Sequence, residues 1–215
     1  LAQVQDNFDD GDFINSPAWA GNTDSFVVFS GQLRLNALGA GKSYLSTSTN
    51  YNLNHEWRLT SRFDFSPSNQ NFCRVYLVSS QSDLSSALNG YYVQLGGSTG
   101  NTDSISLYRQ DGLQRTRLIA GRAGTVSKSQ NAVSLRVVKD SLDGWQLFSD
   151  TTGGINFSLE GSATDSVYKT FEYAGVYCQY TSGNKTNFYF DNFYSGPIII
   201  DQTAPLVDSF AVLSS

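Results

Sequence analysis

The chain has 215 residues, a formal net charge of −5 and a hydrophobic fraction of 40%. This length is enough to bury the core of one all-β domain. The acidic balance argues against nucleic acid as a partner, because phosphate binding requires a concentrated basic surface, and no apolar run approaches the ~20 residues that membrane insertion requires.

The composition predicts β structure. There is no Met and there are only three Glu, whereas Tyr, Phe, Ser, Thr, Gly and Asn are frequent. Aromatic residues and Thr suit the pleated, half-buried surfaces of strands, and Gly, Asn and Ser suit the turns between them. The chain therefore has the residue balance of a sheet protein.

Runs with period-two alternation follow one another at intervals of about 8 to 14 residues, which is the spacing of a sandwich or barrel. Dipeptides such as Asp111-Gly112 and Asp143-Gly144 separate them and favour hairpins. We expect an antiparallel two-sheet jelly-roll sandwich with almost no helix, apart from a short helical turn at residues 82–88. In chain order, the predicted strands are 25–29, 32–36, 43–48, 56–65, 71–79, 91–96, 104–109, 114–119, 133–139, 145–149, 155–160, 173–180 and 187–194.

The two ends of the chain differ from this middle part. Residues 1–4 are expected to be the remnant of a signal peptide or an artificial boundary, which indicates a secreted or cell-surface protein. Residues 5–196 form the predicted sandwich. Residues 197–215 are predicted to be a linker followed by the first strand of another domain, because Asp201-Gln202-Thr203-Ala204-Pro205 precedes a new apolar run.

Cys73 and Cys178 are the two cysteines of the chain, and both have the parity of apolar neighbours in strand-like runs. We expect both side chains to point into the core. A disulfide would form if their strands are neighbours, and two buried free thiols are the alternative.

Three motifs point to a known family. They are 6–13 (DNFDDGDF) with Trp19, 90–96 (GYYVQLG) and 188–193 (FYFDNF). Together they resemble the concanavalin A-like lectin/glucanase (laminin-G-like) jelly-roll domains that stand N-terminally in exported multidomain surface proteins of polysaccharide-degrading, gliding bacteria. The resemblance implies that the closing strand pairs beside the first strand and that an immunoglobulin-like domain follows. This fold serves lectins, glycanases and spacers, so function has to be argued from the site.

Catalytic templates do not match the sequence. Glycoside hydrolysis requires two carboxyl groups that flank the scissile bond, and Glu56, Glu160 and Glu172 are too far apart in sequence to share one strand motif. The single histidine, His55, is predicted to lie at the surface without a nucleophile elbow nearby. We therefore expect no enzyme activity, and a degenerate glycoside hydrolase is the least favoured reading.

Aspartates are dense near the N-terminus. Asp10 and Asp12 lie there, and Asp191 should return to the same end if the last strand pairs beside the first. Hard oxygen ligands at this density suit a structural Ca²⁺. The alternative is a set of solvated turn and cap aspartates, and the spacing is not that of an EF-hand loop.

Strand parity predicts the binding face. If the apolar residues of the central strands face the core, polar and aromatic side chains lie together on an outer face, which we expect to be concave. Tyr92 and Tyr108 would stack on sugar rings, and Arg74 and Gln94 would bind hydroxyl groups, beside Tyr76. Cross-strand Tyr–Arg pairs that only stabilise the sheet are the alternative explanation.

The sequence thus predicts a non-catalytic, secreted module that binds a glycan or polysaccharide. A structural spacer or adhesion scaffold without a small ligand is the alternative function.

Overall fold

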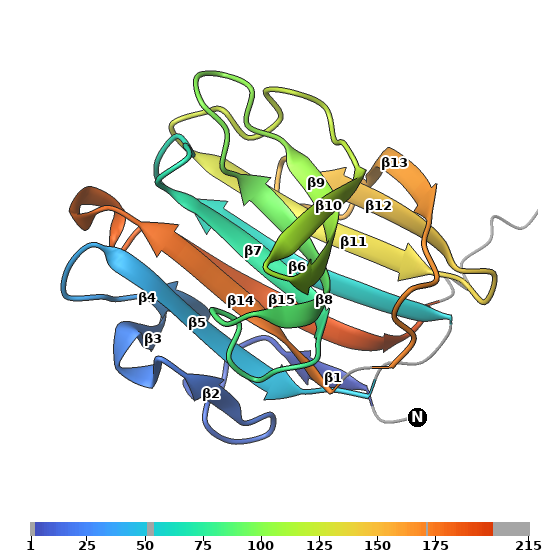
Figure 1. The fold of residues 1–215 in the computed structure, drawn as a ribbon. Helices are drawn as coiled ribbons and strands as arrows, with labels where there is room; N and C mark the ends of the chain where they lie inside the picture. Colours follow the sequence, from blue (N-terminus) through green and yellow to red (C-terminus); the bar gives the residue numbers. More distant parts are fainter. Residues whose placement is uncertain (1–2, 51–53, 171, 200–215) are drawn as a thin grey trace, which may run out of the picture.

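The computed structural model describes residues 3–50, 54–170 and 172–199, which fold as two antiparallel sheets packed face to face (Figure 1). Two short 3-10 helices, η1 (Thr23–Ser25) and η2 (Ser182–Asn184), interrupt the strands. Sheet A has the order β13 (Ser158–Thr164), β12 (Gly144–Asp150), β11 (Asn131–Lys139), β6 (His55–Phe63), β15 (Phe188–Pro197), β4 (Gln32–Leu35) and β3 (Phe26–Phe29), and β1 (Val4–Asp6) also pairs with β15. Sheet B has the order β10 (Gln114–Ile119), β9 (Ile105–Gly112), β8 (Leu88–Gly96), β7 (Phe72–Ser79), β14 (Tyr173–Tyr180), β5 (Gly41–Ser48) and β2 (Trp19–Gly21).

The jelly-roll prediction is confirmed, and its errors have local causes. The alternation pattern missed the short strands β1 and β2, because three residues are too few to show a period, whereas the resemblance correctly implied a first strand beside the closing strand β15. Strand β13 starts at Ser158, three residues after the predicted start, and Ile155 is exposed. Residues 82–87 form an irregular turn without a helix, and Leu88 already begins β8. The predicted linker and following strand, from residue 200 onward, lie outside the described residues.

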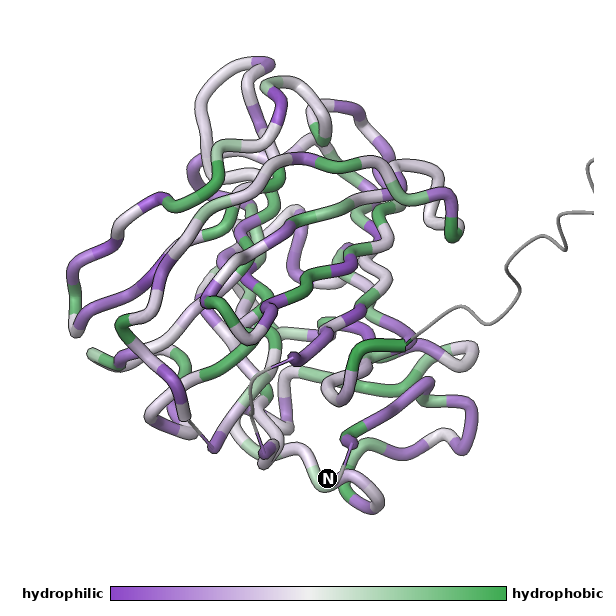
Figure 2. The backbone as a smooth tube through the Cα atoms, turned by 90° about the vertical axis from the view of Figure 1, so that its right-hand side faces the viewer, coloured by the Kyte–Doolittle hydropathy of each residue, from purple (hydrophilic) through white to green (hydrophobic). Residues whose placement is uncertain are grey.

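The core lies between the sheets, and the predicted parity is correct. Figure 2 shows the underlying alternation of hydrophobic and hydrophilic residues along strands. Trp145 is fully buried and stacks on Trp57, with ring centroids 5.6 Å apart. Burying a large apolar side chain contributes roughly 2–3 kcal/mol, so this interior fixes the strand register. The predicted inward residues that the core contains are Trp57, Leu59, Phe63, Val75, Leu77, Tyr91, Val93, Ile105, Leu107, Leu135 and Val137.

The two cysteines are neighbours in register on β7 and β14, and both are buried free thiols. Burial raises the pKa of both thiols. Of the two alternatives, the structure contains the pair of thiols, which are neutral at ordinary pH.

The prediction that His55 lies at the surface is wrong. It begins β6 on the side of the strand that faces the core, is 3% exposed, and its ring contacts the ring of Trp57. Its Nε2 lies 2.9 Å from the hydroxyl of Ser195. Burial lowers the pKa of His55 to about 4.

The helices of the described residues are each a single short turn, and none has the length or the apolar character to cross a bilayer.

Candidate functional site

A row of tyrosines crosses the outer face of sheet B. Tyr76 of β7, Tyr92 of β8 and Tyr108 of β9 are direct neighbours in register. Side chains at such positions stand on the same face of a sheet. The rings of Tyr76 and Tyr92 are 5.1 Å apart, and those of Tyr92 and Tyr108 stack at 5.3 Å with an angle of 8°.

Arg74 lies in the adjacent row of the same face, between Tyr177 of β14 and Gln94 of β8. Its Nε donates a 3.0 Å hydrogen bond to Oε1 of Gln94. Its guanidinium carbon lies 5.1 Å from the ring centroids of Tyr92 and Tyr177 and 5.2 Å from that of Phe72. Each of these contacts has cation–π geometry. Arg74 is therefore held in one position by the surrounding rings and one amide.

Residues 80–87, which connect β7 to β8, cover part of this face together with Leu88, the first residue of β8, and we call residues 80–88 the cover loop. Leu84 and Leu88 are buried against the tyrosines. The Ser46 hydroxyl of β5 donates a 2.8 Å hydrogen bond to the carbonyl of Ser82. Figure 1 shows the same connection in front of β5 and β14. The loop is tied to the neighbouring strands as well as to its own.

The hydroxyl groups of the two covered tyrosines have different surroundings. The Tyr76 hydroxyl donates a 2.9 Å hydrogen bond to Oε1 of Gln110. The Tyr92 hydroxyl is buried without a hydrogen-bond partner among the described residues. Burial raises the pKa of Tyr92 to about 12, which the positive charges of Arg74 and Arg115 oppose. An unpaired buried hydroxyl is unfavourable, so this position is a weak point of the packing.

The structure brings all five predicted binding residues together, but it does not expose them equally. Tyr92 is fully buried, and Tyr76 and Arg74 are nearly so. Gln94 and Tyr108 are half-buried and border the solvent. Tyr92 is thus covered by protein instead of presenting an open ring, whereas Tyr108 keeps an accessible edge.

Sequence reasoning missed two members of the face and its cover. Tyr44 and Tyr177 have the outward parity within strands that were predicted, so the same argument would have found them. The packing of Leu84 on the tyrosines had no periodic signal, because it depends on how an irregular loop folds back.

An open hollow of ≈ 520 Å³ lies at the end of this face. Lys42 and Gln179 line it and belong to the same cross-strand row as Phe72. Gln70 adds a second amide to the lining, and Tyr180 adds an aromatic ring. These groups offer donors, acceptors and an apolar surface in an accessible place.

The acidic residues serve other contacts. Glu56 is buried and accepts hydrogen bonds from Arg58 and Arg136 on sheet A. Glu160 accepts from the Ser149 hydroxyl at 2.6 Å and from Arg122. Both form ion pairs with arginines, and neither lies among the side chains of the sheet B face.

The three predicted calcium ligands do not converge. Both carboxylate oxygens of Asp12 accept hydrogen bonds within its own loop, from Ile14 and Asn15, and Asp10 accepts from the Asp12 backbone. The Asp191 carboxylate accepts from Gln32 and Asn192, and the acidic neighbour that acts on it is Asp9. Within residues 3–50, 54–170 and 172–199, no three His, Cys, Asp or Glu side chains gather as a metal site. These residues do not fit a Ca²⁺ ion.

No protein-family model and no curated protein matches the sequence. Solved structures match the fold. The VIP36 exoplasmic/lumenal domain in its Ca²⁺/Man3GlcNAc-bound form has a TM-score of 0.67 at 13% identity, over 93% of this chain and 90% of that chain. A legume lectin-like domain from Entamoeba histolytica has a TM-score of 0.61 at 14% identity, over 84% and 89%. The carbohydrate-binding module CBM66 from Bacillus subtilis has a TM-score of 0.57 at 13% identity, over 85% and 97%. The described chain therefore has the concanavalin A-like fold of legume-lectin-like domains.

Proposed function

We propose that this chain is a non-catalytic carbohydrate-binding module of an exported protein. The observation that carries the proposal is the sheet B face, where Tyr108 and Gln94 border the solvent beside the fixed guanidinium of Arg74. Sugar rings stack their C–H surfaces on aromatic rings, and their hydroxyl groups need planar donors and acceptors. Two proteins of similar fold support the proposal: the VIP36 domain, which was solved with Man3GlcNAc bound, and CBM66, which is named a carbohydrate-binding module.

Binding would begin at the accessible groups of the face. A sugar ring would lie against Tyr108, and its hydroxyl groups would bond with Gln94. A longer chain would reach the hollow beside Lys42 and Gln179. Such flat contacts bury little area, so we expect weak affinity at each site and a gain from multivalent ligands.

The assignment as non-catalytic rests on the carboxylates. Glycosidases need a carboxyl pair across one groove, and here Glu56 and Glu160 are committed to arginine ion pairs. The Ca²⁺ that accompanies VIP36 in its solved forms has no fitting ligand set in Asp10, Asp12 and Asp191 of this chain. We therefore assign no step of binding to a metal.

A structural spacer is the second candidate function. The cover loop favours it, because Leu84 and Leu88 shield Tyr76 and Tyr92 from solvent. A face that is closed by its own loop stabilises the sheet without any ligand.

A glycan array with the folded domain separates the two candidates. Binding should fall at least tenfold in Tyr108→Ala and in Gln94→Ala, because each removes one of the accessible contacts. Phe148→Ala is the matched control, since Phe148 is a half-buried ring beneath Arg136 on the outer face of sheet A. Binding that EDTA abolishes would contradict the metal-free assignment. No binding to any neutral or charged glycan would leave the spacer as the function.

A further inference from the structure

Most arginines outside the outer face of sheet B pair with a carboxylate, and Arg34 of sheet A instead donates a 3.0 Å hydrogen bond to the carbonyl of Thr186. Arg62 pairs with Asp64 at 3.8 Å, Arg122 with Glu160 at 3.3 Å, and Arg136 with Glu56 at 3.1 Å. The basic side chains on the sheet B face have no such partner. These basic side chains are Lys42, Arg74, Arg115 and Arg117. No carboxylate in the described residues forms an ion pair with any of these four side chains.

The unpaired charges lie on the same side of the sheet. Arg117 pairs in register with Tyr108, and Arg115 pairs with Gln110, which is bonded to Tyr76. Directly opposed residues of antiparallel strands project to one face. The charge of Arg115 acts on the pKa of Tyr76, against the rise that burial causes, so it lies within electrostatic reach of the tyrosine row.

Arg74 is the most informative of the four. It is 6% exposed, and its guanidinium lies among aromatic rings, the Gln94 amide oxygen and the Tyr76 hydroxyl, none of which carries a full negative charge. Burial of a charge is costly unless an opposite charge compensates it, and cation–π contacts compensate only partly. The site therefore contains a fixed positive charge that is not neutralised by the chain itself.

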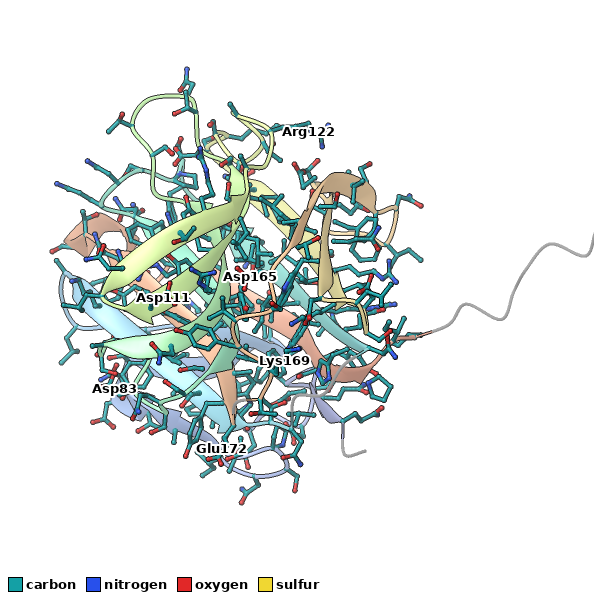
Figure 3. The ribbon with its side chains drawn as sticks, turned by 45° about the vertical axis from the view of Figure 1, so that its right-hand side comes forward. Asp83, Asp111, Arg122, Asp165, Lys169 and Glu172 are labelled. Carbon is teal, nitrogen blue, oxygen red and sulfur yellow. The ribbon has the colours of Figure 1, made fainter. Side chains whose placement is uncertain are left out.

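Acidic side chains around this face are engaged elsewhere and leave the charge of Arg74 uncompensated. Asp83 of the cover loop is engaged with the Tyr44 hydroxyl. Asp111 and Asp165 are both bonded to Arg109. Figure 3 shows Asp111 and Asp165 close together and Asp83 apart from them. The protein has a net charge of −5, so this cationic face runs against the balance of the whole chain.

We propose that the ligand of the sheet B face is an anionic saccharide, whose carboxylate or sulfate groups pair with the exposed Arg115 and Arg117 while a sugar ring lies on Tyr108 and the buried positive charge of Arg74 adds to the attraction. This inference rests on the proposed carbohydrate-binding function and specifies its substrate class. Guanidinium groups bind both kinds of oxyanion through charge-assisted, often bidentate hydrogen bonds. Carboxylates and sulfates share this chemistry, so the test has to distinguish them.

The test uses polysaccharide pairs that differ in charge alone. Polygalacturonate is compared with its methyl ester for the carboxylate, and a carrageenan with the same carrageenan after chemical desulfation for the sulfate, by affinity electrophoresis and calorimetry on the folded domain. One charged member should bind at least about tenfold more tightly than its neutral counterpart, because it adds charge-assisted contacts. That advantage should shrink as salt is raised from 0.05 to 0.5 M, roughly as screening predicts.

Variants assign the effect to the face. Arg115 and Arg117 are exposed, so Arg115→Gln/Arg117→Gln should fold normally and lose most of the charge-dependent advantage. Arg122→Gln is the control, since this exposed arginine is paired with Glu160 elsewhere. Arg74→Gln, with its fold checked by urea unfolding, should remove the remaining advantage.

The outcomes separate the two proposals. Equal binding of charged and neutral members, lost in Tyr108→Ala, would overturn the anionic ligand and keep the saccharide function. Equal binding of polyglutamate, single-stranded DNA and the charged polysaccharides would overturn it in favour of a general polyanion surface. A charge advantage that survives the double arginine variant would also overturn it. Absence of binding to all members would refute both proposals.

Discussion

The outer faces of the two sheets are built from the same kinds of side chain but differ in charge balance. On sheet A, Arg62 stacks on Tyr189 at 3.8 Å and pairs with Asp64. Buried Glu56 there compensates both Arg58 and Arg136.

On sheet B, Arg74 contacts rings without a carboxylate, and Arg115 and Arg117 have no carboxylate partner among the described residues. Sheet A has one such arginine, Arg34, which contacts the rings of Phe29 and Tyr189 and donates to the carbonyl of Thr186. Arginine over an aromatic ring is therefore a structural pattern on both faces, and the gathering of several uncompensated arginines is what distinguishes the candidate site on sheet B.

Removing the compensating charge of sheet A should have the largest effect. Glu56→Ala leaves two arginines unpaired, and breaking a buried pair typically costs about 3–5 kcal/mol. Since the side chains of Arg58 and Arg136 are 32% and 24% exposed, we expect the lower end, about 3 kcal/mol. Urea unfolding measures the loss.

Glu172→Ala is the control for this change, because Glu172 is exposed. It should alter stability by less than about 0.5 kcal/mol. Saccharide binding on sheet B should persist in folded Glu56→Ala. A loss of stability no greater than that of the control would show that the ion pairs on sheet A are unimportant.

The sequence predicts this contrast only in part. Parity correctly separates inward Trp57 from outward Arg58 and gives Arg74 and Gln94 outward positions on their strands, because each follows from a period of two. Parity cannot show that Glu56 reaches Arg136, which is 80 residues away, since that contact depends on the strand order. It likewise cannot show that Leu84 folds over Tyr92, because the turn of the cover loop is set by tertiary packing.

Acid should lower the free energy of unfolding through His55, the first residue of β6. The pKa of His55 is lowered from 6.5 to about 4 by burial, so the unfolded state binds a proton in a range where the folded state does not. Stability from this group is complete above pH 6.5 and is lost as the pH falls toward 4. The expected loss between pH 7 and 4.5 is about 2–3 kcal/mol.

His55→Gln removes the titrating group and provides the comparison for this effect. Its urea midpoint should fall less between pH 7 and 4.5 than that of the unmodified chain. If the urea midpoints of His55→Gln and of the unmodified chain fall equally between pH 7 and 4.5, His55 is not responsible for the loss of stability in acid.

The pH dependence that Tyr92 on sheet B contributes to stability has the opposite sign. Burial raises its pKa from 10 to about 12, so its contribution is present below pH 10 and is lost as the pH rises toward 12.

The cover loop should depend on one leucine. Leu84 is 1% exposed against the tyrosines of sheet B. Leu84→Ala should reduce the free energy of unfolding by about 2 kcal/mol, at the low end for buried leucines because a loop can partly close the cavity. Thermal and urea unfolding measure it.

Leu113→Ala is the matched change at an exposed hairpin position, where Leu113 is 74% exposed. It should leave stability within about 0.5 kcal/mol of the unmodified chain. If both leucine variants behave alike, the cover loop does not pack on the face in solution, and Tyr92 is accessible after all.

The smallest effect concerns single hydroxyl groups of the tyrosine row. Tyr76→Phe removes the 2.9 Å hydrogen bond to Gln110 and leaves that amide oxygen without its donor, which should cost about 1 kcal/mol. Tyr92→Phe removes a hydroxyl that has no partner, so it should leave stability unchanged or raise it by up to about 1 kcal/mol. The two variants delete the same atom from adjacent rings, and urea unfolding of both compares a satisfied with an unsatisfied group directly. A clear loss of stability in Tyr92→Phe would mean that this hydroxyl finds a partner in solution. Such a partner, whether water or a ligand group, would be reached only through the cover loop, so the result would indicate that the loop opens over the face.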